Sequence, residues 1–253
     1  MKLFGSGRDQ PVLRAGVLSD RGRIHENNED ACLADLERGL FAVADGVGGQ
    51  PAGDVAAQVT VNHLPGLIDR ALSHLHDDPG AAIAQAIVDV SEVVQAEAQT
   101  TPELSGMAST VVMVLITGDM AHVAHVGDSR AYLARAGQLY RLTDDHSLAA
   151  ELVQSGVITA EEANSHPFAH SITQAIGLPN TPQPGVRQLE LEAGDRFLLC
   201  SDGLTDMVSE ADIGAILTAG DEIDATSQSL IDTANAAGGK DNISVVVVDY
   251  APG

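Results

Sequence analysis

Four short apolar runs of the chain each deliver an aspartate to a glycine or a short polar turn. Asp45 follows FAVA, Asp128 comes shortly after AHVAHV, Asp202 follows FLLCS, and Asp241 lies just before ISVVVVD. Apolar runs of this length bounded by turn residues are typical of buried strands. A side chain at a strand end is held firmly and still reaches solvent, so the pattern predicts a ligand-binding edge.

If these strand ends converge, several carboxylates meet, which is unfavourable unless cations hold them together. An all-oxygen ligand set favours Mg²⁺ or Mn²⁺ over Zn²⁺. Two such ions can bind phosphate oxygens and activate a water for in-line attack at phosphorus. The alternative is that each Asp-Gly pair only makes a turn, since both residues are common in turns. Four occurrences, with Asn27-Asn28-Glu29-Asp30 upstream, favour the metal interpretation.

Other phosphate-handling motifs are missing from the sequence, which has no GxSxG elbow, no P-loop and no Cys-x5-Arg loop. The glycine run 46–49 is a weak phosphate-loop signal by itself. We expect its glycines to let the backbone approach a metal, or to let the following helix start close to the site.

Composition narrows the class of protein. The 253 residues suit one domain, 1–253, and 36 acidic against 13 basic residues give a net charge of −23. Such a surface repels phosphate backbones, which argues against binding to nucleic acid or anionic membranes. The charge fits either a self-repelling surface or clustered cation ligands. The two cysteines lack the spacing of a zinc site and are expected to be free thiols. The sequence shows no signal-peptide pattern and no stretch long enough for a membrane span, so we expect a cytoplasmic protein.

The order of elements predicts mostly antiparallel sheets covered by helices, because many strands are joined by tight turns and the helices come in pairs. The polar segment 144–170 is expected to hold one short helix, from Ser147 to Gln154, and then a loop. Strands are expected at 12–19, 30–36, 40–44, 107–117, 121–126, 131–135, 185–192, 196–201 and 243–249. Two helices are expected whose apolar positions run from Val55 to Leu75 and from Ile83 to Ala98, separated by Asp78-Pro79-Gly80, and two more at about 209–218 and 222–237.

These residues fall in seven ordered blocks that resemble the type 2C protein phosphatase (PPM) family. The blocks run from about Asp20 to Val248 and read GRIHENNED, VADGVGG, SGMASTVVM, HVGDSRAYL, LTDDHS, FLLCSDGLTD and KDNISVVVV. The resemblance implies an α+β fold, a four-layer α-β-β-α sandwich with metals at one edge between two sheets. It identifies 144–170 as the flap beside the site, a variable element of the family that is thought to influence substrate choice.

The resemblance also implies the metal ligands. Asp45 would bridge two Mn²⁺ or Mg²⁺ ions, and the Gly46 carbonyl would bind the second. Asp202 and Asp241 would bind the first ion, and Asp128 with Asp202 would form a third, weaker site. Through the metal-bound water, Asp45, Asp202 and Asp241 would be the catalytic residues. The reaction implied is attack of a metal-bridging hydroxide on phosphoserine or phosphothreonine.

Glu29 and Asp30 would either bind a metal directly or support the ligands from behind. Where the family usually has an arginine that grips the substrate phosphate, this chain has His25. On a strand, Arg23 would face the same side as His25 and could substitute for it, or it could simply be a solvated surface charge. Val47 stands where some relatives have a histidine proposed as the general acid, so the acid is unassigned.

Three functions compete at this point. A phosphoprotein phosphatase is favoured over a pseudophosphatase, because Asp45, Asp202 and Asp241 are all present. It is favoured over a nucleotide hydrolase by the acidic surface and the lack of an aromatic platform for bases. The expected partners are phosphorylated proteins and a bacterial serine/threonine kinase whose action the enzyme reverses, and we expect a monomer. Most of the remaining histidines are expected at the surface. His122 and His125 fall at opposite parity in an expected strand, so they do not form a metal pair on one face. His166 and His170 fall in the flap together with His146, which is expected to be structural.

Overall fold

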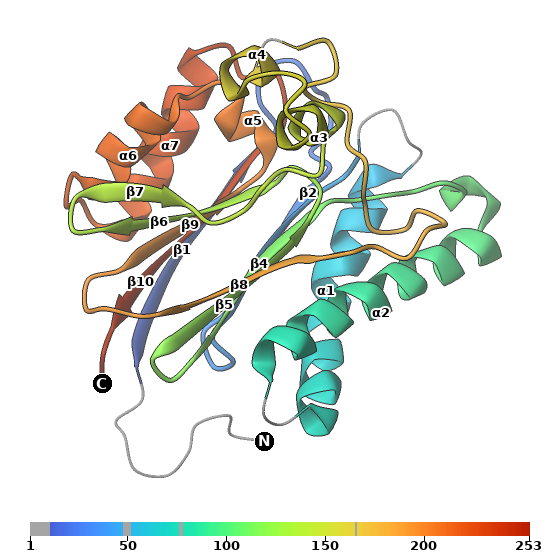
Figure 1. Cartoon of the computed structure of the whole chain (residues 1–253), viewed down its shortest axis with the longest axis horizontal. Helices are drawn as coiled ribbons and strands as arrows, with labels where there is room; N and C mark the ends of the chain where they lie inside the picture. The colour runs from blue at the N-terminus through green and yellow to red at the C-terminus, as the bar shows by residue number, and fades with distance from the viewer. Residues whose placement is uncertain (1–10, 48–51, 76–77, 165) are drawn as a thin grey trace.

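The computed structural model describes residues 11–47, 52–75, 78–164 and 166–253. Within them, two five-stranded antiparallel sheets pack face to face, and helices cover both outer faces (Figure 1). This is the four-layer α-β-β-α arrangement that the sequence predicts. Gly48 and Gly49, which belong to the predicted glycine run, lie outside the described residues.

The first sheet contains, in spatial order, β1 (Val12–Asp20), β10 (Ile243–Ala251), β9 (Arg196–Cys200), β6 (Arg130–Arg135) and β7 (Gln138–Arg141). The chain's first and last strands therefore pair with each other, in the register Asp20 to Ile243. β9 ends directly before Asp202, and β10 begins directly after Asn242. Because β9 and β10 are antiparallel, both termini lie at the same edge of the sheet.

The second sheet contains, in spatial order, β2 (Asp30–Asp35), β3 (Leu40–Asp45), β4 (Val111–Thr117), β5 (Met120–Val126) and β8 (Gly185–Glu190). β3 and β4 are buried along almost their whole length. Such strands, covered on both faces, read as continuous apolar runs rather than as alternating ones. This explains why FAVA and VVMVLI show no period of two.

Helices α1 (Gly53–His74) and α2 (Pro79–Thr100) pack on the second sheet, whereas α6 (Glu210–Thr218) and α7 (Ile223–Ala236) pack on the first. Asp78 begins α2 as its cap, since its side chain accepts a hydrogen bond from the Ala81 amide, and Pro79 occupies the first turn. Between the sheets lies a third apolar layer with Phe41 and Phe197 fully buried. Burial of these layers, at about 25 cal/mol per Å² of apolar surface, is the main favourable contribution to folding.

Several expectations about the elements need correction. The strand predicted at 107–117 begins at Val111, and Ser109 before it makes only isolated bridges. The segment 144–170 contains the predicted short helix as α3 (Leu148–Gln154), capped by Ser147, and also α4 (Ala160–Asn164), which the sequence analysis missed. The short elements β7 and α5 (Asp202–Thr205) were missed too, because four residues show no measurable periodicity.

Cys32 and Cys200 are free cysteines in β2 and β9. Burial raises the pKa of each thiol to about 12, so neither is a reactive thiolate. Among the described residues, no helix has both the length and the apolar character needed to cross a membrane.

Candidate metal centre

Asp45 ends β3 directly opposite Asp30, which begins β2. The Asp45 amide donates to Thr110 Oγ1 (3.1 Å), and its carbonyl accepts from Ser109 Oγ (2.9 Å), so the backbone that presents this carboxylate is fixed on both sides. On the other strand, Asp30 Oδ2 accepts from Ser201 Oγ at 2.8 Å. Ser201 directly precedes Asp202, so this hydrogen bond ties the two sheets together at the site.

Two buried carboxylate oxygens of this cluster have no hydrogen-bond partner in the part of the chain that the structure describes. They are Asp30 Oδ1 and Asp202 Oδ1. A buried acceptor left without a donor costs about 1–3 kcal/mol, and more when it carries charge. A bound cation would supply the partner that these oxygens lack. The available ligand atoms are all oxygens, which fits Mg²⁺ or Mn²⁺.

The carboxylates also act on one another. Burial, followed by the charges of Asp30, Asp202, Asp128 and Asp241, raises the pKa of Asp45 well above its usual range. Burial and the charges of Asp128 and other acidic neighbours do the same to Asp202. Burial raises the pKa of Asp30 to about 6, although hydrogen bonds from serines oppose it. The predicted convergence of Asp45, Asp128, Asp202 and Asp241 is therefore present in the fold.

Asn242 organises the loops on the side of Asp241. Its side-chain carbonyl accepts from the Glu29 amide at 2.7 Å, and its side-chain amide donates to the Arg21 and Asn27 carbonyls. Its backbone amide donates to Asp241 Oδ1 at 2.7 Å. The segment that carries Glu29 and the turn that carries Asp241 are thus held by one side chain. Sequence analysis missed this role, and the only signal was that Asn242 follows Asp241.

His25 approaches the cluster, with its Nε2 atom 3.4 Å from Asp241 Oδ1. Arg23 does not lie beside His25 on the same face of a strand. The interpretation that both lie on one face of a strand is wrong, because β1 ends at Asp20 and residues 22–24 form a turn. The Arg23 amide donates to the Gly239 carbonyl (2.7 Å), so its backbone is fastened to the loop that precedes β10.

The start of α1 is brought against Asp45 by two glycines. A Cβ on Gly46 would overlap the Gly53 backbone, and one on Gly53 would overlap the Glu29 carboxylate. The glycines therefore permit this close approach, as expected for Gly46 in the predicted run. Burial is the main cause that raises the pKa of Glu29, and the charge of Asp54 adds to it. Asp54 belongs to the first turn of α1, so the Glu29 carboxylate lies beside the start of this helix.

Asp128 lies between β5 and β6, after Gly127 with a φ of 102°. Its neighbour Ser129 shares a 2.7 Å hydrogen bond with Thr110, the residue that holds the Asp45 amide. Burial and the charge of Asp145 raise the pKa of Asp128 to about 6. The candidate ligand for the third site is therefore connected to Asp45 through hydroxyl groups, and Thr110 and Ser129 are positioning residues that sequence analysis did not single out.

The flap joins the body at a charged base. Asp145 accepts from the Arg130 guanidinium at 3.0 and 2.7 Å and also from Arg141. His125 and His146 stack there, with ring centroids 4.6 Å apart, and the Gly127 amide donates to the ring of His146. Burial lowers the pKa of His146 to about 4, in line with its expected structural role.

The other histidines divide between the interior and the surface. His122 and His125 are both buried in β5 and are exceptions to the expectation that most histidines lie at the surface. On the flap, His170 is exposed and His166 is half-buried. His170 Nδ1 lies 3.2 Å from Asp206 Oδ2, at the end of α5.

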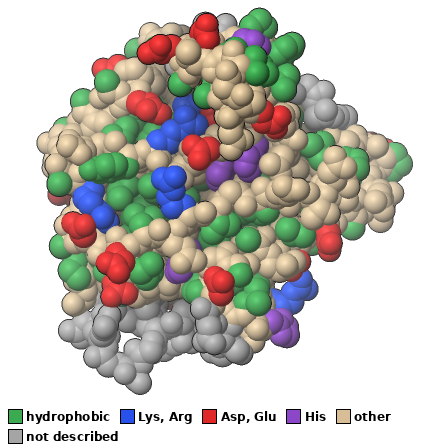
Figure 2. All heavy atoms as spheres, in the orientation of Figure 1, with side chains coloured by type: hydrophobic (Ala, Val, Ile, Leu, Met, Phe, Trp, Pro, Cys, Tyr) green, Lys and Arg blue, Asp and Glu red, His purple; other side chains and the backbone are tan. Residues whose placement is uncertain are grey.

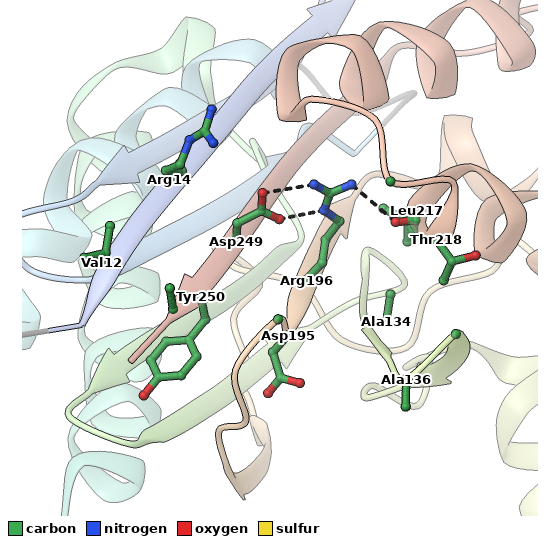
Figure 3. Close-up of a pocket in the computed structure, with 14 residues that line it drawn as sticks. Val12, Arg14, Ala134, Ala136, Asp195, Arg196, Leu217, Thr218, Asp249 and Tyr250 are labelled. Atoms are coloured by element: carbon green, nitrogen blue, oxygen red, sulfur yellow. Dashed lines mark hydrogen bonds and ion pairs between the residues drawn. The ribbon is translucent and has the colours of Figure 1, made fainter. Parts of the chain in front are cut away.

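A cavity of about 510 Å³ lies away from these aspartates (Figure 3). It is lined by Arg196 at the start of β9 and Asp249 near the end of β10, whereas Asp202 follows the end of β9 and Asp241 precedes β10. Arg196 and Asp249 bind each other in bidentate fashion at 2.6 and 2.9 Å. Because the guanidinium and the carboxylate neutralise each other, this pair does not offer the cavity an unpaired charge for a ligand, unlike the carboxylates at the opposite edge.

Acidic side chains on the face shown in Figure 2 are spread over several places rather than gathered in one patch. Both explanations of the net charge of −23 therefore apply: acidic residues dispersed over the surface, and carboxylates clustered as cation ligands. A dispersed acidic surface coexists with a buried cluster at the strand ends.

The fold and the site together define a class: a two-sheet sandwich whose edge gathers carboxylates suited to divalent cations. The Protein phosphatase 2C family profile matches residues 21–239. The chain therefore belongs to the protein phosphatase 2C family, and the resemblance seen in the sequence is confirmed.

Relatives with known names agree with this assignment. The serine/threonine protein phosphatase PstP of Mycobacterium tuberculosis is 40% identical over 243 residues, which cover 94% of this chain but 45% of PstP. The chain thus spans less than half the length of that relative. The serine/threonine phosphatase Stp of Listeria innocua is 33% identical over 241 residues, covering 94% of this chain and 96% of Stp.

A solved structure is also similar. The catalytic domain of PstP in complex with two manganese ions is 38% identical and has a TM-score of 0.77. The match covers 96% of this chain and 100% of that one.

Proposed function

We propose that this chain is a metal-dependent serine/threonine protein phosphatase that hydrolyses phosphoserine and phosphothreonine in other proteins. The observation that carries the proposal is the cluster of carboxylates at the strand ends, in which Asp30 Oδ1 and Asp202 Oδ1 are buried and have no hydrogen-bond partner among the described residues. Membership of the protein phosphatase 2C family and the two manganese ions of the PstP catalytic domain support it.

Asp45 would hold both of two Mn²⁺ or Mg²⁺ ions, the Gly46 carbonyl would bind the second, and Asp202 and Asp241 would bind the first. Asp128 with Asp202 would hold a third ion more weakly. When bound, such ions neutralise phosphate charge and make water a strong nucleophile at neutral pH. The proposal is supported by the mutual effect of these carboxylates on their pKa values, since charges this close require a counter-charge.

The remaining residues would position this machinery and the substrate. Asp30 lies behind Asp45 and Asp202, and Glu29 lies beside the start of α1, so both would support the ligands or bind metal through water. We assign the substrate phosphate to His25, because its ring faces the cluster, and leave Arg23 as the competing donor. The group that protonates the leaving hydroxyl is unassigned.

The proposal is tested by assaying the purified chain on a phosphothreonine peptide and on a nucleotide, with Mn²⁺, with Mg²⁺ and with EDTA. We expect hydrolysis of the peptide that needs metal and stops with EDTA, with little turnover of the nucleotide. Turnover of the nucleotide alone would make the chain a different phosphoester hydrolase. Tight metal binding with no turnover of either substrate would make it a binding module.

We further propose that residues 1–253 form one catalytic domain that works as a monomer in the cytoplasm and reverses a bacterial serine/threonine kinase. The two free cysteines, of which Cys200 is buried, support a reducing location. The apolar layer shared by both sheets supports a single folding unit. Treating a kinase-phosphorylated lysate with the protein would identify the substrates, and light scattering would give the mass in solution.

A further inference from the structure

Three cationic side chains next to the candidate metal centre lack a carboxylate partner within the described residues. Most arginines of the described chain make an ion pair with an aspartate or a glutamate. Arg21, Arg23 and Lys240 make no such pair, and all three are exposed. The Arg21 guanidinium donates to the Glu26 backbone carbonyl at 3.4 Å rather than to a carboxylate. In a chain with a net charge of −23, these cations remain available for an anionic partner.

The three cations come from two turns that pack directly on each other. Gly22 has a φ of 73°, and a Cβ there would overlap the carbonyl oxygens of Gly239 and Asp241. The Arg23 amide donates to the Gly239 carbonyl at 2.7 Å, and a Cβ on Gly239 would lie 2.9 Å from Arg23 Cγ. Lys240 follows Gly239 directly. Arg21, Arg23 and Lys240 therefore form one exposed cationic rim beside Asp241.

The backbone of the first turn is held in place although its side chains are exposed. The Gly22 amide donates to Asp20 Oδ1, and the Arg21 carbonyl accepts from the Asn242 side chain, both at 2.9 Å. Ile24 on this turn is 69% exposed, more than any other large apolar side chain of the described chain. A fixed turn that displays cationic and apolar side chains is preorganised for binding, because little conformational freedom is lost when a partner docks.

We propose that the cationic rim binds acidic side chains that flank the phosphorylated residue of a protein substrate. Ile24 contacts an apolar side chain of the same segment. The inference rests on the proposed function and names its substrate class, phosphoserine or phosphothreonine within an acidic segment. Residues of an extended peptide advance about 3.3 Å each, so a rim beside Asp241 meets residues a few positions from the phosphorylated one. The acidic surface elsewhere repels such a segment, so the rim determines where it can bind.

The test compares three phosphothreonine peptides that differ only in the two residues on each side of the phosphothreonine, which are Glu, Gln or Lys. With Mn²⁺ present, we expect the wild type to show the highest kcat/KM on the Glu peptide and the lowest on the Lys peptide. The readout is the ratio of kcat/KM between the Glu and Gln peptides, in which a loss of activity common to both cancels. Because exposed charges are screened by salt, this ratio should fall toward one in 0.5 M NaCl.

Arg21→Gln and Lys240→Gln are each expected to lower the ratio by about two- to fivefold, the range that exposed ion pairs give. Arg21→Glu should shift the preference toward the Lys peptide. The matched control is Arg187→Gln, which removes the same charge from an exposed arginine on β8 that donates to the Arg141 carbonyl. Its ratio should equal that of the wild type.

Fluorescence anisotropy of labelled peptides on Asp45→Asn, which is expected not to turn them over, measures the same preference as a ratio of Kd values. Equal values for the Glu and Gln peptides in the wild type, or a preference for the Lys peptide, overturn the inference. An unchanged ratio in Arg21→Gln and Lys240→Gln, or an equal fall in Arg187→Gln, overturns it too. A wild type that hydrolyses none of the peptides contradicts the proposed function instead, and the anisotropy ratio then decides whether the rim selects acidic segments.

Discussion

Asp45 lies where burial and four neighbouring carboxylates oppose its negative charge. A carboxyl whose pKa is raised in the folded state destabilises the protein once the pH exceeds its unfolded pKa, and the penalty is complete above the folded pKa. For Asp30 and Asp128, whose pKa values are raised to about 6, this window runs from about pH 4 to pH 6. The metal-free protein therefore carries a penalty at neutral pH that bound cations would remove.

Asp45→Asn is accordingly expected to raise the melting temperature of the metal-free protein at pH 7 by about 2–4 °C, the equivalent of ~1 kcal/mol for a chain of this size. The difference should shrink toward pH 4, where the wild-type carboxyl is protonated. Added Mn²⁺ should stabilise the wild type and not the variant. Thermal melts with EDTA at pH 4, 5.5 and 7 measure this, with Glu92→Gln on the exposed side of α2 as control. A metal-free Asp45→Asn that melts lower at pH 7 would show that the carboxylate is already satisfied.

His25 is the second residue with a direct test. Replacing it by arginine supplies a permanent charge and two parallel donors for a phosphate. Charged hydrogen bonds contribute about 1.5–3 kcal/mol, so KM for a small phosphoester is expected to fall by roughly tenfold. Turnover should change less, because a contact made equally in ground and transition states lowers KM without raising kcat. Steady-state kinetics at two pH values provide the measurement. An unchanged KM in His25→Arg, together with a raised one in Arg23→Ala, would reassign the phosphate to Arg23.

At the scale of elements, the flap depends on its attachment through Asp145. Arg130 is only 19% exposed, and it makes its ion pair with this carboxylate. Although burial raises the pKa of Asp145, the hydrogen bonds and charge of Arg130 outweigh it and lower the pKa below its usual value. The pair therefore stabilises the structure that connects β6 to the flap.

Asp145→Ala would leave the Arg130 guanidinium buried without this partner, and we expect it to lower the free energy of unfolding by about 3 kcal/mol. The matched control is Arg14→Ala, which breaks the pair with Glu222 between side chains that are 60% and 78% exposed. Exposed pairs contribute less than about 1 kcal/mol. Urea unfolding of the three proteins gives both values. Similar losses in the two variants would mean that Asp145 does not anchor the flap in this way.

The strands and the contacts between them differ in how far they could be predicted from the sequence. The apolar runs that end at Asp45 and Asp202 are long enough to be recognised as strands, and their turns predict which residues meet. The hydroxyl contacts of Thr110 and Ser201 join residues far apart in sequence, so no local pattern reveals them. Arg23 was misplaced because strand alternation was extended past Asp20, where the chain turns.

At the scale of the whole molecule, two sheets bring the ends of strands from distant parts of the chain to one edge. β1 and β10 pair across nearly the full sequence, and β3 and β9 contribute Asp45 and Asp202 from different sheets. The ordered blocks of sequence predict this architecture because they match a whole family rather than a single motif. The approach of His170 to Asp206 could not be predicted in the same way, since it depends on how the flap folds back over α5.

In the function proposed above, Asp45 and its neighbours hold a pair of metal ions that drives phosphothreonine hydrolysis. Calorimetric Mn²⁺ stoichiometry, measured beside turnover for the wild type, Asp45→Asn and Asp128→Ala, tests it most directly. We expect two tight ions in the wild type and none in Asp45→Asn, whose turnover should be lower by orders of magnitude. Asp128→Ala should keep both tight ions but show impaired turnover. Two tight ions and full turnover in Asp45→Asn, or loss of both tight ions in Asp128→Ala, would contradict it.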